Sequence, residues 1–578
     1  MDKETYENSE LYKLRHTASH LLAMAAIEFD PKVKLAIGPP IENGFYYDFE
    51  FSKPFSEEDL SALEKSMQKL VERNISVEHL TVKREEAIAK AKKAHQVYKQ
   101  ELMGNLEDKE LSFFRIDNFD DLCKGPHAKS TGEVKALKLL SVAGAYWRGD
   151  EKNAMLTRIY GTAFGGQKEL EKYLEMLEDA KKRDHRKLGK DLGIFTILPA
   201  IGSGLPVWLQ KGATLYRLLE EYVRNVELEA GFQHVITSEL GKKELYETSG
   251  HLDHYADSMY PPIKLDNETF YLRPMNCPHH ISIYADGLHS YKQLPIRIAE
   301  FGEVFRYEKS GELSGLQRVR AFTTNDAHIF CREDQIKDEF KGVIQMIIQV
   351  YKKLGLKDYW FRLSLHDPKN KKKYSSNLEM WEKAENAIRQ ALKEMKIDYV
   401  EAVDEAAFYG PKIDVQMKNV LGREETVSTD QLDFYLPERF GLEYIDEQGK
   451  KARPVMIHRA ILGSMERFIG HYLEQTAGEF PFWLSPIQVR IIPVSDKVAE
   501  YAHEVLNEMK KSGLRAEIDE SNETLGKRIR AAELEKIPYV LVVGEKEAGN
   551  RTVTVRTRQT ADQPTLGLED FLKNLPKG

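Results

Sequence analysis

The chain has 578 residues, too many for a single hydrophobic core, and its length predicts about three or four domains. Its composition, with 42% hydrophobic and 30% charged residues, is that of an ordinary globular protein, and no apolar stretch is long enough to span a bilayer. Without a signal-peptide pattern, the expected location is cytoplasmic. The formal net charge of −8 argues against bulk attraction to nucleic acid, so such a partner would need local basic surfaces.

Three cysteines occur, Cys123, Cys277 and Cys331, and none lies in a short zinc-finger pattern. So few thiols argue against a disulfide framework. Each thiol is therefore a candidate ligand, nucleophile or packing residue.

An apolar stripe with helical period predicts a first helix over residues 10–28; its members are Leu14, Ala18, Leu21, Leu22 and Ala25. His16 and His20 are expected on the opposite face of this helix. A charged helical stretch over residues 167–190 ends the first region. The Gly- and Pro-containing run GSGLPVWLQKGA then opens a second region.

The second region mixes long amphipathic helices, such as residues 212–230, with β-rich runs such as PIRIAEFGEVFRYE and RVRAFTTNDAHIF. The polar loop KSGELSGLQ between these two runs predicts an antiparallel pair. From about residue 483 the short apolar strands VRIIPV and YVLVVG alternate with helices, which predicts a small α/β domain at the C-terminal end.

Charged and polar side chains recur in the run from Arg318 to His328. A strand's period of two puts five of them on one face together with Phe322: Arg318, Arg320, Thr324, Asp326 and His328. Arg306 and Glu308 likewise share a face of the preceding strand. A single histidine or arginine in a strand is usually structural, but cations, a carboxylate and an imidazole together exceed what a buried core requires. The sequence therefore predicts a functional site on this sheet.

The segment EVFRYE resembles motif 2 of class II aminoacyl-tRNA synthetases, and LGSMERF resembles motif 3. With PMNCP, DAHIF, AFYGPK and VMIHRAILGSMERF, the resemblance is specifically to the threonyl-tRNA synthetase family. It implies an α+β multidomain protein whose catalytic core is an antiparallel sheet of about six or seven strands flanked by helices.

The implied domains are an N-terminal α+β editing domain (1–166), a linker helix (167–190), a class II catalytic domain (191–482) and a C-terminal α/β anticodon-binding domain (483–578). The chain is expected to start directly at the editing domain, without the small ubiquitin-like domain of many bacterial members. The resemblance also implies a homodimer with ATP, threonine and threonine tRNA as partners, and no membrane.

By matched position, Arg306 would grip the amino-acid carboxylate and the α-phosphate of ATP, and Arg467 the distal phosphates. Glu308 would orient ATP, and Arg318 would meet phosphate, with Mg²⁺ accompanying the nucleotide. Gly463, one helical turn before Arg467, would let the nucleotide approach closely.

Cys277, His328 and His458 match the three zinc ligands of the family and imply one Zn²⁺ per chain; by spacing alone, buried packing is the commoner fate of such a cysteine. The open fourth position would accept the amino and hydroxyl groups of threonine and reject valine. Further substrate contacts are implied for Asp326, Tyr409, Lys412 and Gln431.

Serine carries the same two groups as threonine, so a second, editing site is expected. His16 and His20 with Cys123 and His127 match the family's HxxxH and CxxxH pair, with Lys99 and Asp121 as helpers. These residues would position water and the seryl ester. Whether they instead bind a metal is open at this point.

The C-terminal domain would read unpaired anticodon bases, with matched candidates Asn522, Lys536, Glu547 and Arg556. Three positions depart from the family pattern: Ser238 replaces the usual motif 1 proline, His279 replaces a glycine beside Cys277, and Thr324 replaces a common glutamine.

Two other functions would explain part of the sequence. A zinc hydrolase built on His16, His20 and Cys123 would leave Arg306 and Arg467 without a role. A non-catalytic tRNA-binding relative would be expected to lose ATP-binding arginines or zinc ligands, which this sequence retains. Amino-acid-dependent pyrophosphate exchange separates both from a synthetase.

Overall fold

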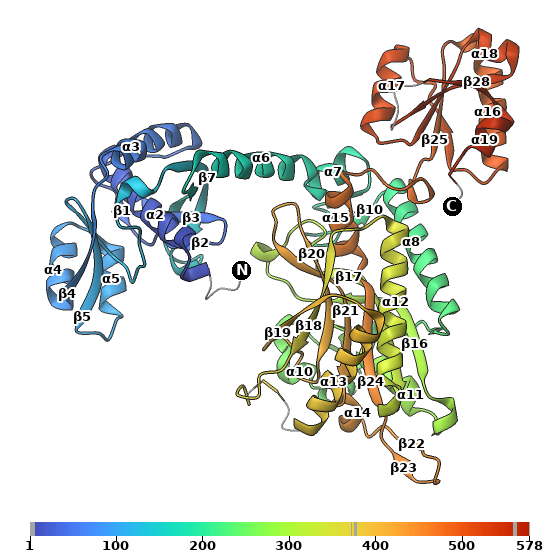
Figure 1. The fold of residues 1–578 in the computed structure, drawn as a ribbon, viewed down its shortest axis with the longest axis horizontal. Coiled ribbons are helices and arrows are strands. Elements are labelled where there is room, and N and C mark those ends of the chain that lie inside the picture. Colours follow the sequence, from blue (N-terminus) through green and yellow to red (C-terminus); the bar gives the residue numbers. More distant parts are fainter. Residues whose placement is uncertain (1–5, 372, 375–377, 559–562, 577–578) are drawn as a thin grey trace. The chain divides into compact units, whose positions relative to one another are not determined.

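The computed structural model describes residues 6–371, 373–374, 378–558 and 563–576. Its contacts divide the chain into two compact units, Met1–Glu178 and Asp179–Gly578 (Figure 1). Within the described ranges, no helix combines the length and the apolar character needed to cross a membrane.

The first unit is built on helix α2 (Glu10–Phe29), which confirms the predicted first helix. Ser9 caps its start by accepting a hydrogen bond from the Tyr12 backbone amide at 3.1 Å. The helix packs with α3 (Leu60–Glu72) on a sheet of order β1-β3-β8-β7, with β2 paired to β3. The strands are β1 (Lys34–Leu35), β2 (Pro40–Ile41), β3 (Gly44–Glu50), β7 (Ala136–Tyr146) and β8 (Met155–Phe164).

The opposite face of α2 is not exposed to solvent, because residues Leu14 to Ala23 are all buried. His16 and His20 therefore lie inside the unit rather than on a solvated helix face, with 7% and 2% of their surface exposed. A buried polar side chain needs partners, so this helix face points to a site.

A second small sheet in the first unit has the order β4-β5-β6, with β4 (Val77–Lys83), β5 (Glu110–Ile116) and β6 (Phe119–Leu122). Helices α4 (Arg84–Lys93) and α5 (Val97–Gly104) pack with it through a separate apolar cluster. The predicted helix over residues 167–190 is two helices, α6 (Gln167–Arg183) and α7 (His185–Asp191). The break falls at Asp184, whose side chain caps α7 by accepting from the Arg186 amide at 2.8 Å.

The second unit contains an eight-stranded sheet of order β11-β16-β17-β24-β21-β20-β18-β19 (Figure 1). The inner neighbours are antiparallel, as predicted, but the edge pairs β11/β16 and β18/β19 are parallel and extend the sheet beyond six or seven strands. The strands are β11 (Gln233–His234), β16 (Ile296–Phe305), β17 (Ala321–Cys331), β18 (Tyr359–Leu365), β19 (Tyr399–Val403), β20 (Lys412–Lys418), β21 (Glu424–Asp433) and β24 (Val455–Ser464).

Long helices of this unit share one large apolar core with the sheet: α8 (Gln210–Glu229), α12 (Ile336–Leu354), α13 (Leu378–Met395) and α15 (Met465–Thr476). Leu215, Leu219 and Val223 recur with helical period on α8 and are fully buried, each contributing roughly 1.5–3 kcal/mol to folding. The side chains on one face of each central strand pack into this core. Alternation then leaves the other face for polar side chains.

Shorter elements surround the sheet. They are β9 (Phe195–Thr196), β10 (Val207–Trp208), β12 (Leu240–Lys242), α9 (Lys243–Thr248), α10 (His251–His254), β13 (Ile263–Leu265), β14 (Glu268–Leu272), α11 (Cys277–Ala285), β15 (His289–Ser290), α14 (Leu436–Arg439), β22 (Tyr444–Ile445) and β23 (Lys451–Ala452).

The C-terminal part confirms the predicted α/β domain. Its sheet has the order β26-β25-β27-β28-β29, parallel from β26 to β27 and antiparallel from there on. The strands are β25 (Val489–Pro493), β26 (Ala516–Ile518), β27 (Tyr539–Val543), β28 (Thr552–Thr557) and β29 (Thr565–Gly567). The helices are α16 (Ala499–Lys511), α17 (Leu525–Leu534), α18 (Glu545–Asn550) and α19 (Leu568–Lys573).

Candidate active sites

Two cavities open on the polar face of the eight-stranded sheet. The larger has a volume of about 590 Å³ and is lined by Arg306, Glu308, Arg318, Phe322 and Arg467, among others. The smaller, about 190 Å³, holds Cys277, His328, His458, Tyr409 and Gln431. Arg306 and Asp326 line both cavities, so a substrate in one would meet a substrate in the other beside these two side chains.

Arg306 follows the last residue of β16, and its backbone amide donates to the Arg320 carbonyl at 3.0 Å. Its guanidinium carbon lies 5.1 Å from the centre of the Phe322 ring. The cation is thereby aimed along the cavity wall, where a carboxylate and a phosphate could share it.

Glu308 and Arg318 face each other across the loop between β16 and β17, with 2.7 Å between Arg318 Nε and a Glu308 oxygen. Arg320 does not share this face, although a strand period over the whole run predicts that it should. The strand begins only at Ala321, and the Arg320 guanidinium turns to the carbonyls of Glu308 and Ser203.

Gly463, near the C-terminal end of β24, has a positive φ of 59°. A Cβ added at this position would lie 3.0 Å from the Val427 carbonyl oxygen. Ser464 then caps α15 by accepting from the Arg467 amide at 3.1 Å. Arg467 is therefore placed in the first turn of a helix beside the larger cavity.

Glu466, next to Arg467, points away from solvent and accepts the Thr323 backbone amide at 3.0 Å. Burial raises the pKa of this carboxyl to about 8. A raised carboxyl pKa stabilises the folded state fully below the unfolded value of about 4.3, and this contribution is lost as the pH rises through 8.

As the pH rises from 5 to 8, we therefore expect the thermal midpoint of a Glu466→Gln variant to fall less than that of the parent protein. Thermal midpoints of both proteins across this range test the expectation, and parallel pH curves would contradict it.

Cys277, His328 and His458 come together from α11, β17 and β24, and one ligand atom of each lies within 4.8 Å of the others. His328 and His458 are direct partners across the β17/β24 ladder. Cys277 is the first residue of α11; burial raises the pKa of its thiol, and a backbone amide at the helix start opposes this shift only in part.

Neighbouring side chains orient both imidazoles of this cluster. His458 Nε2 lies 2.8 Å from an Asp433 oxygen, which leaves Nδ1 as the inner nitrogen. His328 Nδ1 lies 2.8 Å from His280 Nδ1, which leaves Nε2, and these two inner nitrogens are 3.0 Å apart. One thiol and two oriented imidazoles with converging lone pairs fit a zinc ion with an open fourth position.

Asp326 is held at the junction of the two cavities. Its Oδ2 accepts hydrogen bonds from Asn276 Nδ2 and Thr324 Oγ1, both at 2.8 Å. Thr324, which stands where the family commonly has glutamine, therefore orients Asp326 in this chain. Tyr409 donates to the side-chain oxygen of Gln431 at 2.5 Å in the same cavity.

Two residues singled out in the sequence lie apart from these clusters. His279 does not add an imidazole to the Cys277 cluster, because its ring turns toward Tyr246, with 6.4 Å between the ring centres. Lys412 lines neither cavity, and its ammonium lies 2.8 Å from an Asp414 oxygen.

Sequence reasoning also missed Asn276, His280 and Asp433. His280 stands three residues after Cys277, on the same helical turn, and that spacing is a signal that could have found it. Ser238, on the exposed segment that follows β11, accepts the Leu240 amide at 3.1 Å.

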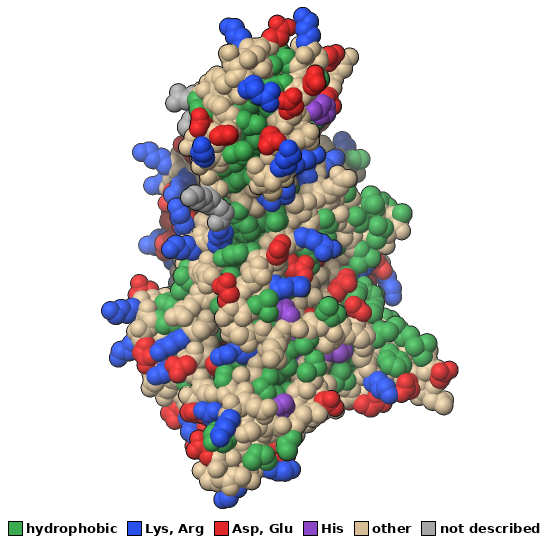
Figure 2. All heavy atoms as spheres, turned by 90° about the vertical axis from the view of Figure 1, so that its right-hand side faces the viewer, with side chains coloured by type: hydrophobic (Ala, Val, Ile, Leu, Met, Phe, Trp, Pro, Cys, Tyr) green, Lys and Arg blue, Asp and Glu red, His purple; other side chains and the backbone are tan. Residues whose placement is uncertain are grey.

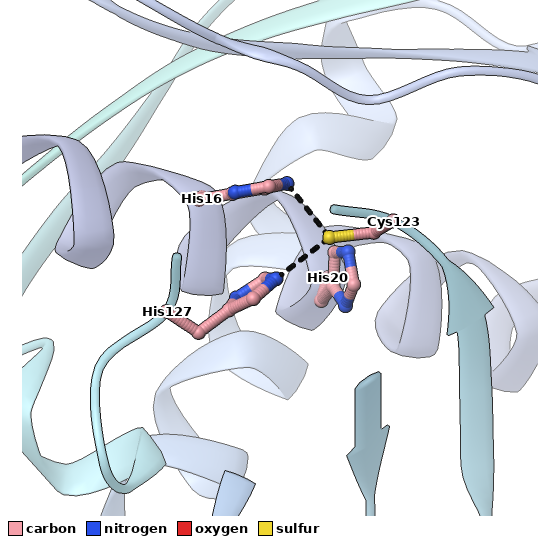
Figure 3. Close-up of side chains that lie close together, drawn as sticks. All are labelled: His16, His20, Cys123 and His127. Carbon is pink, nitrogen blue, oxygen red and sulfur yellow. Dashed lines mark hydrogen bonds between the residues drawn. The ribbon is translucent and has the colours of Figure 1, made fainter. Parts of the chain in front are cut away.

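A second cluster lies inside the first unit (Figure 3). His16 and His20 come from α2, and Cys123 and His127 from the loop after β6, with one ligand atom of each within 4.8 Å of the others. The Cys123 sulfur lies 3.3 Å from His16 Nε2 and 3.0 Å from His127 Nε2.

Burial keeps this second cluster uncharged near neutral pH. It lowers the pKa of His16 to about 4 and raises that of Cys123 to about 12. Asp121 pairs with Lys99 and accepts from the Tyr47 hydroxyl at 2.7 Å, beside a cavity of about 430 Å³. The cluster offers nitrogen lone pairs to a water molecule or a metal ion.

The four anticodon candidates are not gathered into a cluster by hydrogen bonds. Lys536 Nζ lies 2.8 Å from Glu479, outside the C-terminal sheet, and Glu547 accepts from the Gly544 amide and the Thr554 hydroxyl. Arg556 lies on β28 opposite Val540, and Asn522 lies in the loop before α17.

Known families match three parts of the chain. A "tRNA synthetase class II core domain (G, H, P, S and T)" matches residues 262–476, an "Anticodon binding domain" residues 488–577, and a "Threonyl and Alanyl tRNA synthetase second additional domain" residues 111–160. With the sheet topology and the arginine-lined cavity, these matches define a class II aminoacyl-tRNA synthetase.

The relatives narrow this class. The chain is 52% identical to a threonine–tRNA ligase of Anoxybacillus flavithermus over 98% of this chain and 88% of that protein. It is also 52% identical to threonine–tRNA ligase 1 of Bacillus subtilis, over 98% and 89%. A crystal structure of the RNA binding domain of threonyl-tRNA synthetase from Cryptosporidium parvum covers 68% of this chain and 97% of its own, at 40% identity and a TM-score of 0.63. The chain belongs to the threonine–tRNA ligase family.

Proposed function

We propose that the protein activates threonine with ATP, transfers it to the 3′ end of threonine tRNA and hydrolyses mischarged seryl-tRNA in its first unit. The observation that carries the proposal is that the Cys277, His328 and His458 cavity adjoins an arginine-lined cavity large enough for a nucleotide. The strong identity to threonine–tRNA ligases supports the same assignment.

Arg306, at the junction of the cavities, would hold the threonine carboxylate against the α-phosphate of ATP. A carboxylate oxygen attacks the α-phosphorus, and the bond to the leaving pyrophosphate breaks. Arg467 would neutralise the distal phosphates, and Glu308 and Arg318 would orient the nucleotide. Mg²⁺ bound with ATP would supply further positive charge to the phosphates.

Cys277, His328 and His458 would hold one zinc ion. When bound, zinc supplies a Lewis-acidic position for the amino and hydroxyl groups of threonine. Asp326, fixed by Asn276 and Thr324, would accept a hydrogen bond from the threonine hydroxyl. Tyr409 and Gln431 would make further contacts with the substrate. Valine offers a methyl group in place of that hydroxyl and cannot donate this hydrogen bond to Asp326.

His16, His20, Cys123 and His127 would form the editing site, with Lys99 and Asp121 beside it. We favour hydrolysis by a positioned water over a metal site. His16 Nδ1 lies 3.1 Å from the Pro126 carbonyl, so Nε2 of a neutral ring carries the lone pair. The Cys123 thiol lies 3.3 Å from this nitrogen but nearer, at 3.0 Å, to His127 Nε2, and its single hydrogen on His127 leaves the His16 lone pair for a water proton.

We further propose the domain division 1–166, 167–190, 191–482 and 483–578, anticodon contacts from the C-terminal part, and a cytoplasmic homodimer. Acidic and basic side chains are interspersed over most of the face in Figure 2, so tRNA binding would depend on local contacts.

ATP–pyrophosphate exchange with threonine, serine and valine, on protein of measured zinc content, tests the function. We expect exchange with threonine, weaker exchange with serine, none with valine and about one zinc per chain. Absence of exchange with every amino acid in folded, zinc-loaded protein would overturn the synthetase assignment and favour a non-catalytic relative.

A further inference from the structure

His185, the first residue of α7, connects two parts of the larger cavity's wall. Its ring is 2% exposed, with Nδ1 2.7 Å from Glu474 Oε1 on α15 and Nε2 3.0 Å from the Leu316 backbone nitrogen. The His185 backbone amide donates to the same Glu474 oxygen at 3.3 Å. One imidazole thus joins three segments that are far apart in the sequence.

The two partners determine which ring nitrogen carries the proton. The Leu316 amide can only donate, so His185 Nε2 must accept and be unprotonated. Nδ1 then carries the hydrogen and donates to the Glu474 carboxylate, a charge-assisted bond. Glu474 therefore keeps the imidazole in the one tautomer that can hold Leu316.

Leu316 lies in a tight turn from Ser314 to Arg318, which we call the pocket turn. The Ser314 and Arg318 amides each donate to the other's carbonyl, at 3.1 and 3.2 Å. Gln317 and Arg318, the next residues after Leu316, line the larger cavity. The position of Leu316 consequently sets where these two side chains enter that cavity.

Two glycines allow this close approach. Gly315 has a φ of 49°, and an added Cβ would lie 2.2 Å from His185 Nε2. On α15, a Cβ at Gly470 would lie 3.2 Å from the Leu316 side chain and 3.5 Å from the His185 ring. The imidazole, the pocket turn and α15 are in direct contact, with no room for another side chain.

We propose that His185 is a positioning residue for adenylation, which holds the pocket turn through Leu316 so that Gln317 and Arg318 are in place for ATP. It touches no substrate itself. Arg467 stands on the same helix as Glu474, so the His185–Glu474 pair ties the pocket turn to the helix that carries the second phosphate-binding arginine. The inference rests on the proposed function, because it assigns ATP to the larger cavity.

The test is steady-state pyrophosphate exchange on the full-length, zinc-loaded protein, with ATP and threonine varied separately. We expect His185→Ala to raise the KM for ATP about tenfold, because part of the binding free energy of ATP must then order the pocket turn. The KM for threonine should stay within about twofold. His185→Gln should recover most of the loss, since its amide can accept from Leu316 and donate to Glu474.

Glu474→Ala should also raise the KM for ATP, and combining it with His185→Ala should add little, because the two residues act as one unit. Asp191→Ala, at the exposed end of the same helix, is the matched control and should change neither KM. Thermal midpoints of all variants separate loss of stability from loss of ATP affinity.

A lower midpoint with an unchanged KM for ATP in His185→Ala would overturn the inference and leave a purely structural histidine. Equal rises in both KM values, or no recovery in His185→Gln, would also overturn it. If His185→Ala does not fold, the Glu474→Ala and His185→Gln variants decide between the same outcomes. Failure of the parent protein to exchange pyrophosphate would instead refute the proposed function.

Discussion

Replacing Cys277 with alanine is expected to lower the zinc content to well below one per chain and to reduce threonine-dependent pyrophosphate exchange by more than about a hundredfold. The variant keeps the two imidazoles, 3.0 Å apart between inner nitrogens, but loses the anionic ligand that balances the metal's charge. Metal analysis and exchange assays on the same preparation measure both effects.

Cys331→Ala is the matched control for this experiment. Cys331 is an equally buried thiol at the end of β17, three residues after His328, and it belongs to no ligand cluster among the described residues. Its variant should keep zinc and exchange activity. A Cys277→Ala protein with full zinc and normal exchange would refute the proposed metal site.

Replacing His16 with alanine is expected to slow hydrolysis of seryl-tRNA by about a hundredfold or more while threonine activation continues at its normal rate. The reason is that His16 belongs to a self-contained unit with its own core, and its lone pair is the one we assign to the water proton. Deacylation of preformed seryl-tRNA, measured beside pyrophosphate exchange, tests both halves of the expectation.

His79→Ala provides the comparison, because His79 is an exposed histidine on β4 that does not belong to the cluster of His16, His20, Cys123 and His127. The zinc content of the parent protein also decides between the two forms of the editing site. About one zinc per chain, unchanged in His16→Ala, supports a positioned water. Two per chain, falling to one in the variant, would replace that mechanism with a metal-bound hydroxide.

Secondary structure was predictable from local pattern, whereas the fold class of the catalytic core came from the resemblance to a family. The apolar stripe of α2, the antiparallel β16/β17 pair and the C-terminal α/β domain all follow from periodicity, which depends on neighbours in the sequence. The sequence-based prediction failed at the ends of helices and strands and at the edges of the large sheet. The helix over 167–190 breaks because Asp184 caps a new one, and Arg320 leaves the strand face because the strand starts one residue later.

Residue types, together with the resemblance of short motifs to a family, indicated which side chains could carry the chemistry: cysteine and histidine for a metal, arginine for phosphate, and paired histidines with a cysteine for hydrolysis. Only the tertiary structure decided which of them meet. Cys277, His328 and His458 are joined through α11 and a cross-strand register, whereas His279, beside Cys277 in the sequence, turns away. Distances between segments far apart in the chain depend on packing, and no local pattern encodes them. For the same reason, the link from His185 to Glu474 and Leu316 is visible only in the folded protein.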